Sequence, residues 1–135
     1  MLITILLCVA SLAALVGAIA GARYLFLCPA LEKHVASTRP DFKTDQAGST
    51  SWNQTRWALD RVRTRTGLTA IITYAIGMAT LIPLQSLLKA AEKTTSAPTV
   101  IMLLLTAALL SVGLRSIVHN SRTSELDMRR RYPTF

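Results

Sequence analysis

Two histidines are the side chains of this sequence best suited to hold a metal or a haem. His34 follows the first long apolar segment and His119 follows the third. If these segments cross a membrane in the same direction, both rings lie at the same membrane rim, where paired imidazoles can ligate iron or another metal. Neither histidine has Cys, Asp or Glu at a ligand spacing. We therefore expect two solvated histidines, with no cofactor and no metal.

Three further polar side chains give a catalytic interpretation. Arg56, Asp60 and Arg63 precede the second apolar segment and, with His34 and His119, could form a small enzyme site at the membrane rim. The apolar segments themselves contain no Asp, Glu, His or Lys, the usual marks of proton relays and ligand sites inside a membrane. The sequence also has no glycine-rich phosphate loop, G-x-S-x-G or C-x-x-C motif. We expect no catalytic residue, and an enzyme is the less favoured interpretation.

Three long uncharged segments must position these side chains. Hydrophobic residues make up 51% of the chain and charged residues only 16%, against about 25% charged residues in soluble proteins. The uncharged segments are residues 1–22, 68–88 and 94–114. Since about 20 apolar residues suffice for a helix to cross a membrane, we predict an all-α integral membrane protein with one domain, residues 1–135. Its transmembrane helices are expected at about residues 2–28, 68–90 and 98–119.

The basic residues indicate the orientation of these helices. Eight Lys and Arg lie from Arg23 to Arg65 and five from Arg115 onward, whereas only Lys89 and Lys93 separate the second and third segments. With three crossings, the positive-inside rule places the first connection and the tail in the cytoplasm. We expect an inner, plasma or organelle membrane protein with its N-terminus outside. An anionic inner leaflet accounts for the net charge of +8, so no nucleic-acid partner is expected.

The first segment has an alternative interpretation as a cleaved signal peptide. Ala18, Ala20 and Ala22 resemble a small-residue cleavage site. However, no basic residue precedes the segment, and it is longer than the usual apolar core of about 7–15 residues. We expect it to be retained as a helix. Cys8 and Cys28 would then lie about 30 Å apart on that helix, too far to form a disulfide with each other.

Small residues repeat along the first segment. Alanines recur every four residues, and Gly17 and Gly21 form a GxxxG motif, a spacing that lets helix backbones approach closely. The sequence predicts a helix-packing face on one side of this segment. Its residues are Ala10, Ala13, Ala14, Gly17, Ala18 and Gly21. The sequence leaves open whether this face packs within the chain or against another subunit.

Residues 29–67 and 120–135 are expected to form cytoplasmic, amphipathic helical extensions and a basic tail. Ser51 and Gln54 have the spacing of a capping box, which predicts a helix from about residue 52 onward. This helix either continues to about residue 93 or lies flat on the membrane and bends at Gly67. Its expected membrane-surface residues are Trp52, Arg56, Trp57, Arg61, Arg63 and Arg65. In the tail, Arg115, Arg122 and Arg129 are seven residues apart and share one face.

These observations favour an accessory, structural or assembly subunit that packs through helix contacts into a larger membrane complex. Its expected partners are the bilayer with its anionic inner leaflet and other membrane-spanning subunits or further copies of the chain. The alternative is a self-oligomerising pore. Three spans, an outside N-terminus and a basic tail resemble the topology of one class of phage holin. The connection of about 45 residues between the first two spans departs from the short turn of that class.

Overall fold

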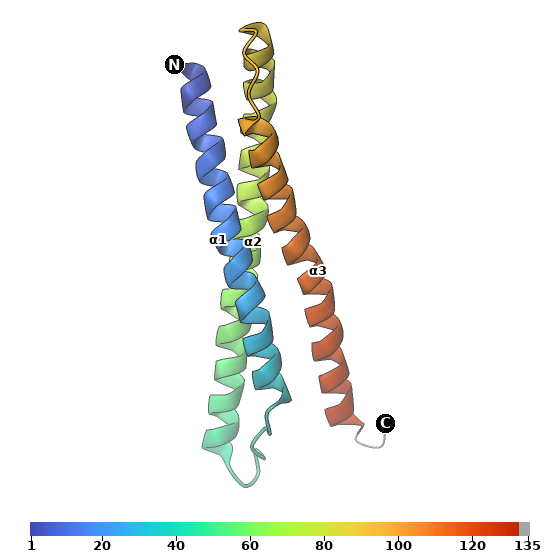
Figure 1. Ribbon diagram of the computed structural model, residues 1–135. Coiled ribbons are helices and arrows are strands. Elements are labelled where there is room, and N and C mark those ends of the chain that lie inside the picture. Colours follow the sequence, from blue (N-terminus) through green and yellow to red (C-terminus); the bar gives the residue numbers. More distant parts are fainter. Residues whose placement is uncertain (133–135) are drawn as a thin grey trace.

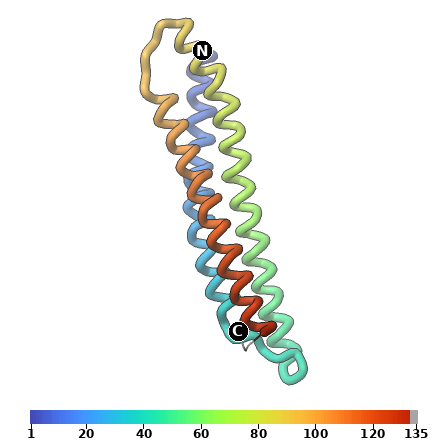
Figure 2. The backbone as a smooth tube through the Cα atoms, turned by 90° about the vertical axis from the view of Figure 1, so that its right-hand side faces the viewer, coloured from blue at the N-terminus to red at the C-terminus, as the bar shows by residue number. Residues whose placement is uncertain are grey.

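Three long α-helices make up the protein in the computed structural model, which describes residues 1–132. They are α1 (Leu2–Ala36), α2 (Gln46–Ala90) and α3 (Ala97–Arg131), and they run side by side in two perpendicular views (Figure 1, Figure 2). Each helix is long and apolar enough to cross a membrane. The predicted all-α fold with three such helices is therefore confirmed. The expectations for the last three residues of the tail lie outside the described residues.

The helices are longer than a bilayer needs. At 1.5 Å per residue, a helix of 35 residues such as α1 or α3 spans about 52 Å, whereas the hydrocarbon layer is about 30 Å thick. Most of the charged residues lie at one end of the bundle, which we call the polar end. It comprises residues 29–36 of α1, 46–65 of α2 and 115–131 of α3.

Helix α1 continues without a break through Pro29 and ends at Ala36. Ser37 caps it, because its backbone N–H donates to the carbonyls of Lys33 and His34. The helix therefore stops just before Arg39 and Pro40, where the residue preceding a proline disfavours helical geometry. The expected extension beyond residue 28 is thus part of one helix.

Helix α2 begins at Gln46, six residues before the start at about residue 52 that the capping box predicted. That prediction is wrong. Asp45 is the N-cap, and its Oδ1 accepts a hydrogen bond of 2.9 Å from the backbone N–H of Gly48. An Asp three residues before a free N–H satisfies the helix start as well as a serine does. Ser51 therefore lies inside the helix. The helix runs unbroken through Gly67 and Pro83 to Ala90, as in the long-helix alternative and not as a bent interfacial helix.

A connection of residues 91–96 joins α2 to α3, and it begins with a tight turn (Figure 1). The backbone N–H of Lys93 donates a hydrogen bond to the carbonyl of Leu88, and Glu92 takes the left-handed conformation with φ of 55°. This arrangement ends a helix by satisfying its last carbonyls. Ser96 is the N-cap of α3, and Pro98 lies in its first turn, where a proline needs no N–H partner.

Two apolar clusters hold the helices together. In the first, Ala10 and Ala14 of α1 pack against large side chains of the other helices, and the members are Ala10, Ala14, Leu81, Leu84, Leu88, Ile101 and Leu105. The second lies nearer the polar end and contains Ala20, Tyr24, Cys28, Ala70 and Val112. Only 22% to 33% of the most apolar stretch of each helix is buried. A large apolar surface therefore faces outward, as expected for helices surrounded by lipid.

Candidate functional site

The small-residue face of α1 packs inside the chain. Ala10, Ala13, Ala14, Gly17 and Gly21 are buried, whereas Ala18 is exposed. A Cβ atom at Gly17 would lie 2.9 Å from the Thr73 hydroxyl of α2, and one at Gly21 would contact Ala108 of α3. The face therefore serves contacts among the three helices of one chain.

Glu32 is the centre of the polar end. Its carboxylate accepts hydrogen bonds from Arg115 at 3.1 Å and Arg122 at 3.2 Å, and lies 3.2 Å from Nδ1 of His119. Only 8% of Glu32 is exposed. One acidic residue of α1 thus binds three basic residues of α3. The seven-residue spacing of Arg115 and Arg122 places both beside it, while Arg129 pairs instead with Glu125.

The ionisation of Glu32 follows from these contacts. Burial by itself raises the pKa of the carboxyl group, but the hydrogen bonds from Arg115 and Arg122 outweigh it and leave the pKa below its ordinary value. Glu32 is therefore a carboxylate at neutral pH. Sequence reasoning missed this residue. The available signal was that Glu32 is the only acidic residue in the first 40, among several basic ones.

A second contact joins α1 to α2 beside the cluster. The guanidinium of Arg63 donates to Asp60 at 2.9 Å and to the hydroxyl of Tyr24 at 2.9 Å. Tyr24 is 2% exposed, and its ring lies close to Gly67, where a Cβ would come within 3.1 Å. Arg63 was expected at the membrane surface, but its side chain is only 14% exposed. The planar guanidinium of Arg63 makes its hydrogen bonds inside the bundle.

Arg56 joins α2 to α3. It binds Asp127 through two parallel hydrogen bonds of 3.1 and 2.9 Å, the bidentate geometry that gives the strongest carboxylate contacts. The hydrogen bonds from Arg56 hold the pKa of Asp127 below its ordinary value. Arg56 was likewise expected at the membrane surface, and the structure places it against α3.

Trp52 is buried where α1, α2 and α3 meet near their ends. Its indole stacks on His34 with ring centroids 4.9 Å apart, and its Nε1 donates to the Ser37 hydroxyl. The guanidinium of Arg130 lies 4.8 Å from the indole and also donates to the carbonyl of Ser37. Trp52 is thus only 7% exposed. It packs against the end of α1 and does not lie on the outer surface, where lipid could reach it.

The other predicted residues are divided between surface and interior. Trp57 is 69% exposed, and Arg61 and Arg65 are exposed as well. His119 is 2% exposed, so the expectation of a solvated ring is wrong there, because Glu32 and the surrounding helices enclose it. His34 binds the backbone carbonyl of Trp52, so each histidine has a different partner. Within residues 1–132, no group of three or more His, Cys, Asp and Glu could hold a metal.

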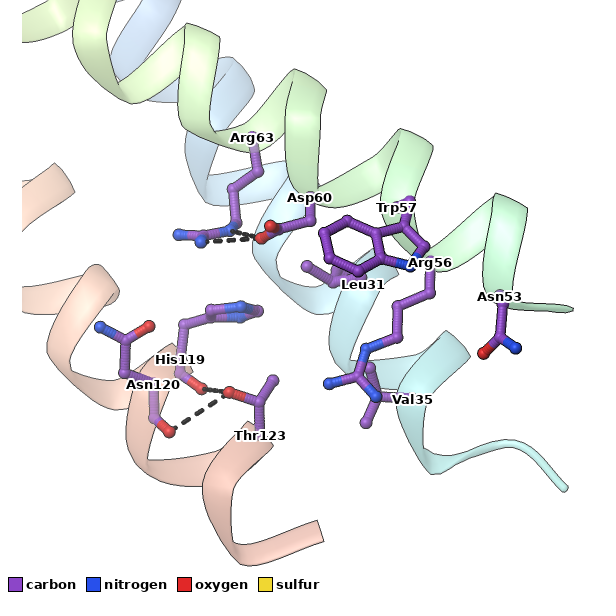
Figure 3. Close-up of a pocket in the computed structure, with 10 residues that line it drawn as sticks. All are labelled: Leu31, Val35, Asn53, Arg56, Trp57, Asp60, Arg63, His119, Asn120 and Thr123. Atoms are coloured by element: carbon purple, nitrogen blue, oxygen red, sulfur yellow. Dashed lines mark hydrogen bonds and ion pairs between the residues drawn. The ribbon is translucent and has the colours of Figure 1, made fainter. Parts of the chain in front are cut away.

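A cavity of about 360 Å³ lies beside these contacts (Figure 3). Figure 3 shows α2 and α3 on opposite sides of it, with Leu31 and Val35 of α1 behind. The lining residues are Leu31, Val35, Asn53, Arg56, Trp57, Asp60, Arg63, His119, Asn120 and Thr123. It combines two guanidinium groups and two amides, all hydrogen-bond donors, with one carboxylate.

The lining groups are engaged in ways that disfavour covalent catalysis. The hydroxyl of Thr123 donates to the backbone carbonyls of His119 and Asn120, so it is not paired with a base. Asp60 accepts two hydrogen bonds from the guanidinium of Arg63 at its Oδ1, so this oxygen already has partners. The described lining therefore resembles a binding cavity with an excess of donors more than a catalytic site.

Comparison with known proteins gives no relative. The sequence matches no protein-family model, and neither the curated proteins nor the solved structures give a match.

Proposed function

We propose that this chain is an integral membrane protein with its N-terminus outside and its polar end in the cytoplasm. Thirteen of the fifteen Lys and Arg residues lie in the first connection and the tail or at their borders with the spans, and the positive-inside rule favours that side as cytoplasmic. The ion pairs at the polar end support placing that end outside the hydrocarbon core. Paired Glu32, Asp60 and Asp127 require an aqueous border rather than a hydrocarbon core.

We further propose that it is a non-catalytic accessory or assembly subunit of a larger membrane complex. The observation that carries this proposal is the mutual pairing of the charged groups at the polar end. Glu32 ties α1 to α3, Arg63 ties α2 to α1, and Arg56 ties α2 to α3. Such pairing supports a rigid scaffold that acts through contacts, because the acids that could serve as bases are held by arginines.

A partner surface is available on the outward face of α1. Its large side chains recur at intervals of seven, and each is more than half exposed: Ile5, Leu12, Ile19 and Phe26. A seven-residue apolar repeat is the spacing with which helices pack as left-handed pairs, in membranes as in water. Since the small-residue face is used within the chain, this opposite face is the proposed contact with another subunit or a second copy.

The pore-forming alternative has less support. A water-filled pore needs polar groups along a span, and the hydroxyls of Thr69, Thr73 and Thr80 instead donate to carbonyls of their own helix. The enzyme alternative also has less support. Its five residues, His34, Arg56, Asp60, Arg63 and His119, have structural partners of their own.

The accessory-subunit proposal predicts co-purification that depends on the outward face of α1. The tagged chain, extracted from its own membrane in a mild detergent, should carry one or more membrane proteins at a fixed ratio. Replacing Leu12 and Ile19 with Ala removes apolar contact area in the proposed interface, and we expect the amount of co-purified protein to fall at least about fivefold, which corresponds to roughly 1 kcal/mol. Quantitative mass spectrometry measures the ratio.

The matched control replaces Leu104 and Ile72, exposed side chains on the other two helices, with Ala. It removes the same atoms from positions with no large apolar side chain seven residues before or after them, since Leu104 has Ala97 and Ser111 there and Ile72 has Arg65 and Ala79. The ratio should stay unchanged. A parent chain that purifies alone would contradict the proposal, as would equal losses in the two double variants. Growth arrest with membrane leakage on expression would favour the pore former instead.

A further inference from the structure

An apolar cavity of about 580 Å³ lies between α2 and α3, next to the polar cavity. Most of its lining is aliphatic, and several of those side chains are more than half exposed, including Leu68, Leu110 and Leu114. The full lining is Tyr24, Arg63, Thr64, Gly67, Leu68, Ile71, Leu109, Leu110, Val112, Gly113, Leu114, Ser116 and Ile117. An open apolar cavity of this size suits a hydrocarbon chain that enters from the side.

Arg63 borders both cavities. Arg63 and Tyr24 both line the apolar cavity, and the guanidinium of Arg63 lies beside Asp60 at the polar cavity (Figure 3). A molecule that filled both spaces would therefore have an apolar tail and a polar head that meet at Arg63. This is the shape of a membrane lipid whose head lies at the border of the bilayer.

The charges around the polar cavity favour an anionic head. The polar end and its connecting loop, residues 29–65 and 115–131, carry twelve Lys and Arg against six Asp and Glu. Arg63 uses three of its five N–H groups, on Asp60 and Tyr24, and Arg56 uses two, on Asp127, so both retain donors. The Asp60 carboxylate faces the same space, but Arg63 already balances its charge. The remaining donors fit phosphate oxygens.

We propose that this site binds one anionic phospholipid of the surrounding bilayer, with an acyl chain between α2 and α3 and its phosphate at Arg63 and Arg56. The lipid fills a space that the three helices leave open and adds a contact between α2 and α3. The inference rests on the membrane placement proposed above and not on the presence of a partner subunit. A chain that purifies alone could still bind the lipid.

Lipid titration of the full chain in a non-ionic detergent tests the proposal. Native mass spectrometry counts bound lipid as phosphatidylglycerol or phosphatidylcholine with the same acyl chains is added. We expect one phosphatidylglycerol per chain, bound at least about tenfold more tightly than phosphatidylcholine. Both lipids offer a phosphate for charge-assisted hydrogen bonds, but the quaternary ammonium group of phosphatidylcholine is repelled by the arginines, whereas phosphatidylglycerol has no cationic group. Inorganic phosphate at millimolar concentration should not compete, since it lacks the acyl chain.

Two variants separate the head and tail contacts. Arg63→Gln should abolish the preference for phosphatidylglycerol, and Arg61→Gln, which removes an equal charge from an exposed residue of the same helix, should retain it. Gly113→Leu should weaken both lipids at least fivefold, because a Cβ there meets nothing within 4 Å and a larger side chain fills the apolar cavity. This variant decides the question even if Arg63→Gln does not fold.

Three results would overturn the proposal. They are equal affinity for the two lipids, an equal loss in Arg61→Gln and Arg63→Gln, and unchanged binding in Gly113→Leu. Competition by inorganic phosphate would assign the polar cavity to a free anion and remove the lipid from the account.

Discussion

Replacing Gly17 and Gly21 with Ile should destabilise the isolated chain itself. A Cβ at Gly17 lies 2.9 Å from the Thr73 hydroxyl, and one at Gly21 lies 3.6 Å from the Cβ of Ala108, so the remaining isoleucine atoms have no free space. Overpacking of this kind costs about 1–3 kcal/mol at each site. The free energy of unfolding, measured by circular dichroism during denaturant titration in detergent, should fall by that amount for each substitution.

The matched control is Ala18→Ile on the same helix. Ala18 was predicted to belong to the packing face, but it is exposed, so isoleucine there should change the free energy of unfolding by less than about 0.5 kcal/mol. The double variant would contradict the structure if it unfolded like the parent. If the double variant lost self-association or partner binding but kept its free energy of unfolding, this face would be a contact between chains and not within one chain.

Removing the Glu32 carboxylate should produce the largest effect of a single substitution. In Glu32→Ala, the partly buried Arg115 and the buried His119 lose their acidic partner, and breaking a buried ion pair from one side costs about 3–5 kcal/mol. The matched control is Glu125→Ala, which breaks an exposed pair with Arg129 worth about 0.3–0.5 kcal/mol. Thermal unfolding of the two variants compares these losses. Similar losses would show that the Glu32 cluster does not hold the polar end together.

The same carboxylate predicts a dependence on pH. The pKa of Glu32 is lower in the folded chain than its ordinary value of 4.5, so the stability it contributes is present at neutral pH. That contribution declines as the pH falls below about 4.5 and through the lower, folded pKa. The parent should therefore lose stability in this range, whereas Glu32→Gln, which lacks the titrating group, should lose less. Parallel pH profiles for the two proteins would contradict the assignment.

Much of the fold could be predicted from the sequence because membrane helices depend on segment length and apolarity. Three helices long and apolar enough to cross a membrane, and the continuation of the third past Arg115, followed from such local signals. The start of α2 did not, because two caps of similar strength lie six residues apart. Asp45 and Ser51 both suit an N-cap, and the chain continues the helix back to the first of them.

The polar end could not be predicted because its contacts join residues far apart in the sequence. Glu32 and His119 are separated by 87 residues, and Arg56 and Asp127 by 71. Amphipathic spacing correctly indicated a helix around Trp52, but it could not distinguish a lipid surface from a neighbouring helix. The indole of Trp52 and the fork of Arg63 suit either environment, and the structure encloses both.

A topology measurement tests the central claim, which is that the polar end of a three-span bundle lies in the cytoplasm. A reporter active only in the cytoplasm can be inserted at Lys43, in the turn between Glu92 and Ser96, and at the C-terminus. We expect activity at Lys43 and at the C-terminus, and none in the turn. Activity in the turn with silence at the other two sites would invert the orientation. Activity at only one of Lys43 and the C-terminus would place them on opposite sides and contradict three crossings.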